Sequence, residues 1–235
     1  MISRRSIACA FAVAFLLGSV YATDATASCE DPPHRKVDWS GCQKMALFLR
    51  GADLREAQFD GADLSRTDLM DASLVGATLV KANLSRARLR QADLRKADLS
   101  KIHGYRTDFH EANLAGASLF KADLDWADLS GASLINADLS KVVLGRSSLI
   151  GADLRDADLK KSYLARADIR HAEVAGADFA DAYLEFADLS GVDLSNARGL
   201  TSQQLAAACG DAFTKLPNGV ARPTTWPCPD EDTER

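Results

Sequence analysis

Residues 81–100 of the chain read KANLSRARLRQADLRKADLS, four consecutive five-residue units with a leucine at the fourth place of each. The same period continues without an insertion from position 54 to position 194. Of these 29 positions spaced five apart, 23 are leucine, and five others are Phe59, Phe109, Ile169, Val174 and Phe179. Only Gly104 departs from the rule. The residue two places before each of these positions is alanine in 22 of the 29 units, so a small residue accompanies each large one.

A period of five fits neither standard secondary structure. In an α-helix, five residues turn the chain by about 500°, so successive leucines would spread around the cylinder. In a flat strand the side chains alternate between two faces, and an odd period would make the leucines alternate as well. A chain that bends once in every five residues can instead point every leucine inward, with coils stacked about 4.8 Å apart through backbone hydrogen bonds.

The units GADLR at 51–55, KADLD at 121–125 and GADLR at 151–155 resemble the A-(D/N)-L-x-x unit of the pentapeptide-repeat family. The resemblance implies an all-β solenoid, specifically a right-handed quadrilateral β-helix with four pentapeptides per coil. The 29 units would then form about seven coils. The leucine and the small residue before it would point inward, and the other three positions outward. Each buried leucine would contribute about 1.5–3 kcal/mol to stability.

The pattern divides the chain into four segments. Residues 1–27 carry Arg4 and Arg5, a short apolar run and small residues, which is the order of a secretory signal peptide. The apolar run is about half of the ~20 residues that a membrane span requires. We expect an N-terminal cap over residues 28–50, the repeat solenoid over 51–198, and a C-terminal cap over 199–235. In this last segment, TSQQ at 201–204 predicts a capping box and a short helix ended by Gly210.

The signal peptide predicts that the chain is exported, to the periplasm or the medium, and the paired arginines leave both the general and the twin-arginine route open. Four of the five cysteines lie beyond residue 27, two before the repeats and two after them. In an oxidising compartment we expect the pairs Cys29–Cys42 and Cys209–Cys228, one at each end of the solenoid. The spacing of these cysteines does not match a metal site.

If four units form one coil, residues twenty apart stack on one another, and the surface can be read as columns. The lysine column contains Lys81, Lys101, Lys121, Lys141 and Lys161. Two interpretations stay open. The column is either a solvated edge that blocks lateral aggregation, or a stripe that binds an anionic glycan or lipid headgroups.

A second column, here called the arginine–aromatic column, contains Arg66, Arg86, Arg106, Trp126, Arg146, Arg166 and Phe186. Beside it, at the place that usually holds Asp or Asn, stand Val143, Tyr163 and Tyr183. The candidate interaction face consists of Trp126, Val143, Tyr163, Tyr183, Phe186, Arg146 and Arg166. Aromatic residues with arginine are typical of protein interfaces, although simple ladder packing along the stack would give the same pattern. On the same side, Gly104 should cause a local bulge, with Ile102 filling part of the space.

No nucleophile, P-loop, dinucleotide or metalloprotease motif occurs, and the many aspartates follow the repeat spacing. We therefore expect a non-catalytic exported scaffold that binds a protein through its outer faces. We expect no catalytic residue, cofactor, metal, nucleic-acid partner or membrane span in the mature form, and leave a homodimer open. The family resemblance offers a second function, since some members are acidic DNA mimics that bind type II topoisomerases. The signal peptide and the basic columns argue against it. A binder of anionic glycan or lipid headgroups through the lysine column is the third.

Overall fold

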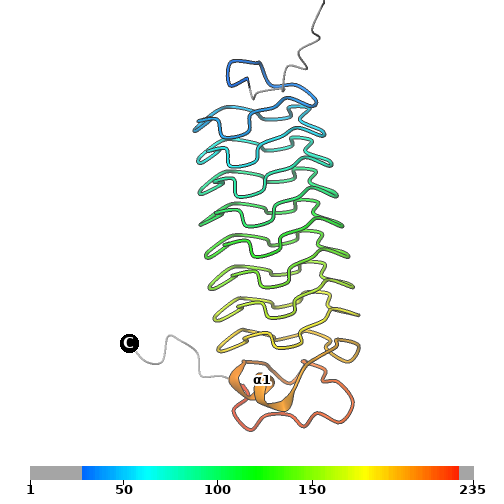
Figure 1. The fold of residues 1–235 in the computed structure, drawn as a ribbon. Coiled ribbons are helices and arrows are strands. Elements are labelled where there is room, and N and C mark those ends of the chain that lie inside the picture. The colour runs from blue at the N-terminus through cyan, green and yellow to red at the C-terminus, as the bar shows by residue number, and fades with distance from the viewer. Residues whose placement is uncertain (1–27, 228–235) are drawn as a thin grey trace, which may run out of the picture.

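The computed structural model describes residues 28–227, so the predicted signal peptide and Cys228 lie outside the described residues. The described chain forms a β-helical solenoid whose coils stack along one axis (Figure 1). Parallel bridges connect each coil to the next with an offset of twenty residues, as in Asn83 to His103 and His103 to Asp123. One coil is therefore four pentapeptides. Between residues 28 and 227, no helix is long and apolar enough to cross a membrane.

The backbone N–H groups of a pentapeptide are satisfied in a fixed way. In the unit around Leu84, the N–H groups of Asn83, Leu84 and Arg86 donate to carbonyl groups of the neighbouring coils, and that of Ala82 closes a turn. The N–H of Ser85 donates to the side-chain Oδ1 of Asn83 at 3.0 Å. A short polar side chain that bonds to the backbone two residues on is the usual role of Asp and Asn in turns. This bond explains why the residue before the leucine is so often Asp or Asn.

The coil turns at the second residue after each leucine. These residues have a left-handed backbone, with φ of 57° at Lys121 and 62° at Trp126. Such a backbone costs an L-residue about 1–2 kcal/mol, which the packed interior must offset. The corners recur every fifth residue and leave no room for a continuous strand. The sheets therefore consist of isolated bridges, one per pentapeptide, and not of strands with bounds of their own.

The interior contains the two apolar columns, as predicted. Leu94 and Leu119 are fully buried, and the alanine column is buried beside the leucines. At Thr67, Thr107 and Ser147 a hydroxyl group replaces alanine and donates to a backbone carbonyl, as Thr107 Oγ1 does to Leu84 at 2.8 Å. The prediction that the large and the small residues both point inward is confirmed. These side chains contribute most of the buried apolar surface.

The N-terminal end begins to coil earlier than expected. The bridge ladder starts at Asp38, within the segment 28–50 that was predicted to be a cap, so the later part of that segment continues the solenoid. Trp39 is buried, its ring centroid lies 5.8 Å from that of Phe59, and it closes this end of the interior. The predicted disulfide Cys29–Cys42 is present and joins the first described residues to the coil.

At the other end, α1 spans Ser202–Ala207 (Figure 1). Thr201 caps it, accepting from the Gln204 N–H and donating its own N–H to the Gln204 side chain, so the predicted capping box is present. The Gln204 amide also donates to the carbonyl groups of Phe179 and Ala182, both at 2.9 Å. These bonds hold α1 against the last regular coil.

The helix does not end at Gly210, which was the expected terminator. It ends at Ala207, and Cys209 already pairs with Asp188 in the bridge ladder. Gly210 has a different role, because a Cβ at this position would lie 2.5 Å from the ring of Trp226. Cys209 is disulfide-bonded, and its predicted partner Cys228 is outside the described residues.

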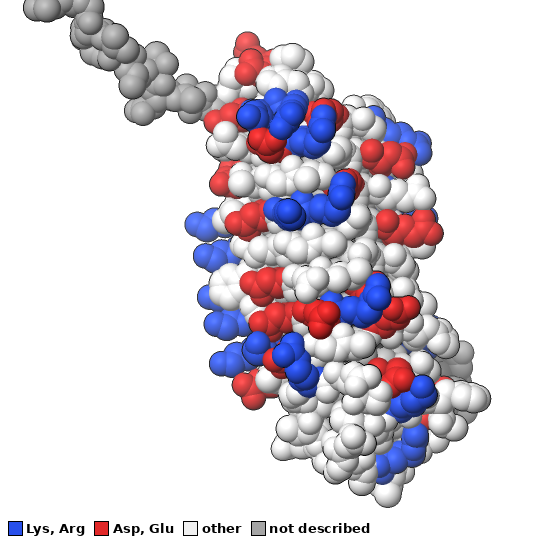
Figure 2. Space-filling model, turned by 90° about the vertical axis from the view of Figure 1, so that its right-hand side faces the viewer, with Lys and Arg blue, Asp and Glu red and all other residues white. Residues whose placement is uncertain are grey.

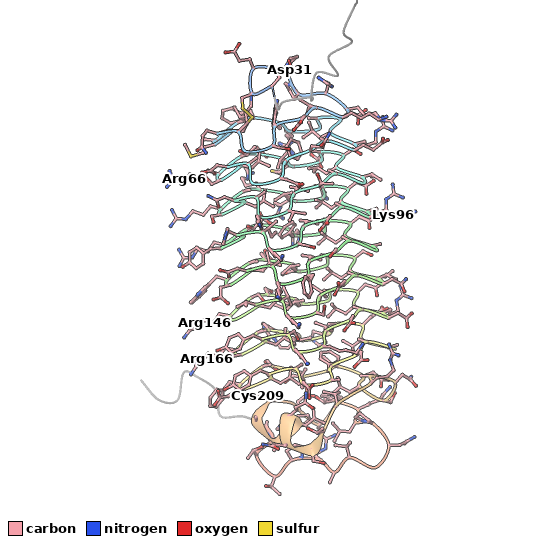
Figure 3. All side chains as sticks on the ribbon, in the orientation of Figure 1. Asp31, Arg66, Lys96, Arg146, Arg166 and Cys209 are labelled. Atoms are coloured by element: carbon pink, nitrogen blue, oxygen red, sulfur yellow. A yellow bond between two sulfur atoms is a disulfide. The ribbon has the colours of Figure 1, made fainter. Side chains whose placement is uncertain are left out.

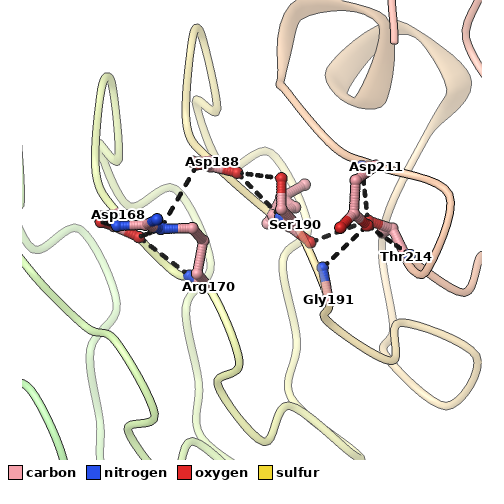
Figure 4. A network of polar contacts seen from close by, with 8 residues as sticks. Asp168, Arg170, Asp188, Ser190, Gly191, Asp211 and Thr214 are labelled. Carbon is pink, nitrogen blue, oxygen red and sulfur yellow. Dashed lines mark hydrogen bonds and ion pairs between the residues drawn. The ribbon is translucent and has the colours of Figure 1, made fainter. Parts of the chain in front are cut away.

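The segment after α1 is tied to the solenoid by Asp211 (Figure 4). Its Oδ1 accepts from the Gly191 N–H at 3.0 Å and from the Thr214 N–H at 2.9 Å. Several N–H and O–H donors to Asp211 hold the pKa of its carboxyl below the usual value, even though burial acts in the opposite direction. This end is therefore fixed by charge-assisted hydrogen bonds as well as by apolar contacts.

Gly104 does not produce the expected bulge. His103 forms bridges to the coils on both sides, and the Gly104 N–H donates to the Asp123 carbonyl at 2.7 Å, so the register is unchanged. A Cβ at Gly104 would lie 2.5 Å from Cδ2 of Leu124. Leu124 of the next coil occupies the space beside Gly104, and Ile102, predicted to fill part of it, is buried as well.

We expect Gly104→Leu, which restores the repeat consensus, to lower the free energy of unfolding by about 1–3 kcal/mol because the interior is already filled. Chemical denaturation of the purified chain measures the change. The double variant with Leu124→Ala should lose less than the sum of the two single changes. A stabilised Gly104→Leu variant would contradict this account of the packing.

Ser162 lies in the alanine column, is buried, and has no hydrogen-bond partner for its Oγ among the described residues. We expect Ser162→Ala to raise the free energy of unfolding by about 1 kcal/mol, because it removes an unsatisfied buried hydroxyl. Ser147→Ala is the matched control, since the Ser147 hydroxyl donates to the Leu144 carbonyl at 2.7 Å. It should be neutral or destabilising. Equal effects of the two changes in thermal denaturation would argue against this assignment.

Candidate interaction face

One face of the solenoid lies between the lysine column and the arginine–aromatic column. In each coil it consists of the four residues between two corners, as residues 122–125 lie between Lys121 and Trp126. We call this surface the tyrosine face; it comprises residues 62–65, 82–85, 102–105, 122–125, 142–145, 162–165 and 182–185. The twenty-residue offset of the bridges places equivalent positions of successive coils one above another.

Two of the three tyrosines of this face stack on each other. The ring centroids of Tyr163 and Tyr183 lie 5.2 Å apart with an interplanar angle of 5°. The residues are 44% and 45% exposed, so each ring offers surface to solvent although it is in contact with the other. Val143, which precedes them in the column, is only partly exposed. The stack therefore begins at Tyr163.

The arginines of the neighbouring column lie over aromatic rings. The guanidinium carbons of Arg106 and Arg146 lie 5.6 and 5.2 Å from the Trp126 ring centroid, and that of Arg166 lies 5.1 Å from Phe186. Such contacts contribute about 0.5–1 kcal/mol at exposed sites and hold the arginine side chains extended along the corner. The residues of this column therefore form a ladder, and the ladder is exposed. Ladder packing and a role as a protein interface are both compatible with this arrangement.

A pocket of about 370 Å³ lies between the tyrosines and the arginines. Four of the seven predicted face residues line it, namely Arg146, Tyr163, Arg166 and Phe186. The other four lining residues were not predicted: Asp125, Gly145, Ala165 and Glu185. The sequence feature that could have predicted this pocket is the residue after the leucine. Gly145 and Ala165 at this position are small and leave a hollow between larger neighbours.

Asp125 lies in this pocket with one carboxylate oxygen unsatisfied. Its Oδ1 is buried and has no hydrogen-bond partner among the described residues. Burial and the neighbouring charge of Asp123 raise the pKa of this carboxyl above its ordinary value. A Cβ at Gly145 would lie 2.7 Å from Asp125 Oδ1, so the glycine makes room for the carboxylate.

A second carboxylate, that of Glu185, also lines the pocket. The Tyr183 hydroxyl donates to Glu185, and this bond raises the pKa of the phenol. Glu185 thereby orients the ring of Tyr183. The pocket is thus lined by two carboxylates, two arginines and two aromatic rings.

Several arginines that directly follow a leucine are paired with the aspartate just before it. Arg55 and Arg155 illustrate the geometry: their guanidinium groups hold the carboxylates of Asp53 and Asp153, with Nη2 to Oδ2 distances of 2.5 Å in both pairs. The guanidinium of Arg55 lowers the pKa of Asp53 to about 2. Bidentate pairs of this kind neutralise both groups.

The corner position is different because its side chain points away from the aspartate of its own unit. Lys36 at a corner reaches an acid only because Glu56 stands in the next coil of the same column. The two columns beside the tyrosine face offer no such acid next to most of their members. No ion pair within residues 28–227 is recorded for Lys81, Lys101, Lys121, Lys141, Lys161, Arg66, Arg86, Arg106 or Arg146.

The views agree with this division of charge. Figure 2 shows acidic and basic side chains in contact on the face toward the viewer and a row of basic side chains along one edge. In Figure 3, Arg66, Arg146 and Arg166 lie along one edge of the solenoid, and Lys96 lies on the opposite edge. Lys121 and Lys141 of the lysine column lie over the Phe120 ring, at 5.2 and 5.5 Å from its centroid. The face is therefore bordered by positive charge on both sides.

In the part of the chain that the structure describes, no three His, Cys, Asp or Glu residues converge to hold a metal ion. The chemistry that the tyrosine face offers is binding, through aromatic surface, arginine donors and a hollow.

Comparison with known proteins identifies the repeat. The family model described as pentapeptide repeats matches in eight copies, over residues 49–86, 67–103, 87–131, 127–164 and 162–198. No curated protein matches the chain.

Solved structures with the same repeat resemble the chain. HetL, a pentapeptide repeat protein involved in heterocyst differentiation regulation from the cyanobacterium Nostoc sp. Strain PCC 7120, is 28% identical, with 80% of this chain and 86% of HetL covered and a TM-score of 0.48. Trypsin-treated QnrB1, a plasmid-mediated fluoroquinolone resistance protein, is 22% identical, with 74% of this chain and 91% of QnrB1 covered and a TM-score of 0.50. The likeness to QnrB1 supports the fold alone.

The exposure of Trp126 allows the charge of the arginine–aromatic column to be tested. Trp39 and Trp226, the other two tryptophans, are buried. Iodide should therefore quench mainly Trp126, and more strongly than caesium does, because Arg106 and Arg146 concentrate anions beside it. We expect replacing both arginines with alanine to lower the iodide quenching constant about twofold. Lys96→Ala serves as the control and should leave quenching unchanged; equal quenching by iodide and caesium would contradict the prediction.

Proposed function

The chain belongs to the pentapeptide-repeat family, and from that premise we propose that it is an exported, non-catalytic scaffold whose tyrosine face binds a protein partner. Pentapeptide-repeat proteins are generally non-catalytic binding proteins. In this proposal the scaffold is a right-handed, four-sided β-helix that α1 closes at its C-terminal end. It has about eight coils and not seven, because the ladder already begins at Asp38.

The observation that carries the proposal is the concentration of exposed aromatic surface on one side. Tyr105, Tyr163 and Tyr183 lie on the tyrosine face, and Trp126 and Phe186 lie at its corner; all five are more than a third exposed. Tyrosine, tryptophan and arginine are the residues most enriched in the energetically important centres of protein interfaces. Their long apolar surfaces lose little conformational entropy on binding, because the stack and the cation–π contacts already hold them.

Export is supported by the order of residues in segment 1–27 and by the disulfide Cys29–Cys42, which suits an oxidising compartment. We propose a periplasmic or secreted location on these grounds. Fractionation of the source cells, with the mature N-terminus determined by sequencing, tests both the location and cleavage near residue 27.

Two other functions compete with this one. The drug-resistance role of QnrB1 belongs to that protein, and a mimic of nucleic acid would need an acidic surface where this chain has two basic columns. Binding of an anionic glycan or lipid headgroups is favoured by one specific observation, the unpaired lysine column. It leaves the exposed tyrosine stack without a role, and we therefore place it second.

The proposal is tested by placing a photo-cross-linking amino acid at Tyr163 of the full chain in the cells that produce it. We expect a discrete protein adduct from Tyr163, because this ring lies at the centre of the proposed interface. Ile150 is the matched control, since it is 37% exposed at the same height in the stack but outside the tyrosine face. Adducts should be absent there or differ from those at Tyr163.

Tyr163→Asp together with Tyr183→Asp should abolish co-purification of the same protein without changing the thermal stability of the solenoid by more than about 1 kcal/mol, because both side chains are exposed. A chain that forms no protein adduct at Tyr163, or whose partner is retained by the double variant, would show that the face is not an interface.

A further inference from the structure

Two basic columns border the tyrosine face, and the arrangement follows from the pentapeptide. The four residues of the face lie between two left-handed corners. In four coils one corner carries lysine and the other arginine, namely Lys81 with Arg86, Lys101 with Arg106, Lys141 with Arg146 and Lys161 with Arg166. At Lys121, Lys141, Arg106 and Arg146 the φ values lie between 54° and 59°. A left-handed corner directs its side chain outward, so these cations project beside the face and not across it.

These four cations form no ion pair within residues 28–227. Most other arginines and lysines of the described solenoid pair with an aspartate or glutamate, as Arg95 does with Asp93 and Arg170 does with Asp168. None of the five lysines of the lysine column has such a partner within the described residues, and neither does Arg106 or Arg146. Like charges about 4.8 Å apart repel each other, so a stack of them is stabilised by whatever brings opposite charge.

The floor between the columns carries the opposite charge at several places. Asp63 and Asp123 occupy the position before the leucine, and Asp125 and Glu185 the position after it. Asp125 lines the pocket, so a further negative group placed there would be repelled. The surface is therefore positively charged along both columns, and the floor between them carries negatively charged and uncharged side chains.

This order of charge discriminates among anionic partners. A uniform polyanion or an anionic membrane would satisfy the two columns but would place negative charge over Asp123, Asp125 and Glu185. A folded protein can present carboxylates at two rims and neutral or basic side chains between them. Complementary charge of this kind selects partners and speeds association. The exposed aromatic stack favours the same class of partner.

We infer that the partner of the tyrosine face is an acidic protein surface, whose carboxylates lie over both the lysine column and the arginine–aromatic column. This inference rests on the proposed function, because it names the chemistry of the partner at the same face. The lysines and arginines contact carboxylates of the partner along the two edges of the face, and the pocket beside Tyr163 accepts a neutral or basic side chain of the partner.

Carbodiimide is the direct probe, because it joins a lysine amine to a carboxylate with which it is in contact. We expect carbodiimide treatment of the source cells to link Lys121 or Lys141 to aspartate or glutamate residues of the same protein that photo-cross-links at Tyr163. Lys96 is the matched control: it is also a corner lysine without a recorded ion pair, and it lies on the opposite edge (Figure 3). It should form no link to that protein.

Charge reversal provides the second readout. We expect Lys121→Glu with Lys141→Glu, or Arg106→Glu with Arg146→Glu, to lower the yield of the Tyr163 photo-adduct at least tenfold, and Lys96→Glu to leave it unchanged. The yield from the parent chain should fall as salt concentration rises, since the contacts are exposed. Far-ultraviolet circular dichroism of each variant shows whether the solenoid is intact, and Lys121→Gln separates loss of charge from its reversal.

The outcomes separate the two proposals. A Tyr163 protein adduct that survives both charge reversals and shows no carbodiimide link would overturn the acidic partner and leave the protein-binding scaffold standing. No protein adduct at Tyr163 would overturn both. If the parent chain binds vesicles of phosphatidylglycerol or polygalacturonate and the lysine reversals abolish that binding without affecting any protein adduct, the columns serve a lipid or a glycan and the inference is wrong.

Discussion

The structure depends on one constraint: the backbone must enter the left-handed region at every fifth residue. Each corner costs an L-residue about 1–2 kcal/mol. The cost is offset because the corner turns the next leucine inward, where burial contributes about 1.5–3 kcal/mol. The interior therefore contains four large side chains per coil, each beside a small one. Where a large residue is missing, at Gly104, the leucine of the next coil fills the space and the coil keeps its register.

The same constraint decides the chemistry of the surface. The position before the leucine is occupied by Asp or Asn because its side chain satisfies a backbone N–H two residues on, as Asn83 does for Ser85. A cation placed after the leucine meets that carboxylate and is neutralised, as Arg155 is by Asp153. A cation at the corner points away from it. Whether a lysine or arginine pairs with an aspartate thus depends on its place in the unit. The two corner columns remain positively charged.

Where Val143, Tyr163 and Tyr183 replace the usual Asp or Asn, the unit gives up the polar side chain that would bond to its own backbone. The aromatic stack takes its place, and the small residues Gly145 and Ala165 leave a hollow beside it. On the tyrosine face this exchange lies toward the C-terminal half; on another face the exposed Phe48 takes the same place in its unit. A local departure from the repeat that exposes aromatic surface is expected at a functional site. The proposed binding of an acidic protein follows from this departure from the repeat.

The sequence by itself determined the period, the inward columns, the stacking of residues twenty apart and hence the membership of each surface column. The period and the inward direction of the leucines follow from their spacing, whereas the stacking of residues twenty apart follows from the four units per coil that the family resemblance implies. It also predicted Cys29–Cys42 and the capping box of α1. Only the tertiary structure decided which charges are paired, that Leu124 fills the space at Gly104, that the ladder begins at Asp38, and that Asp125 and Glu185 join four predicted residues in one pocket. Those features depend on side-chain directions and on contacts between neighbouring coils. The five-residue period does not determine such contacts.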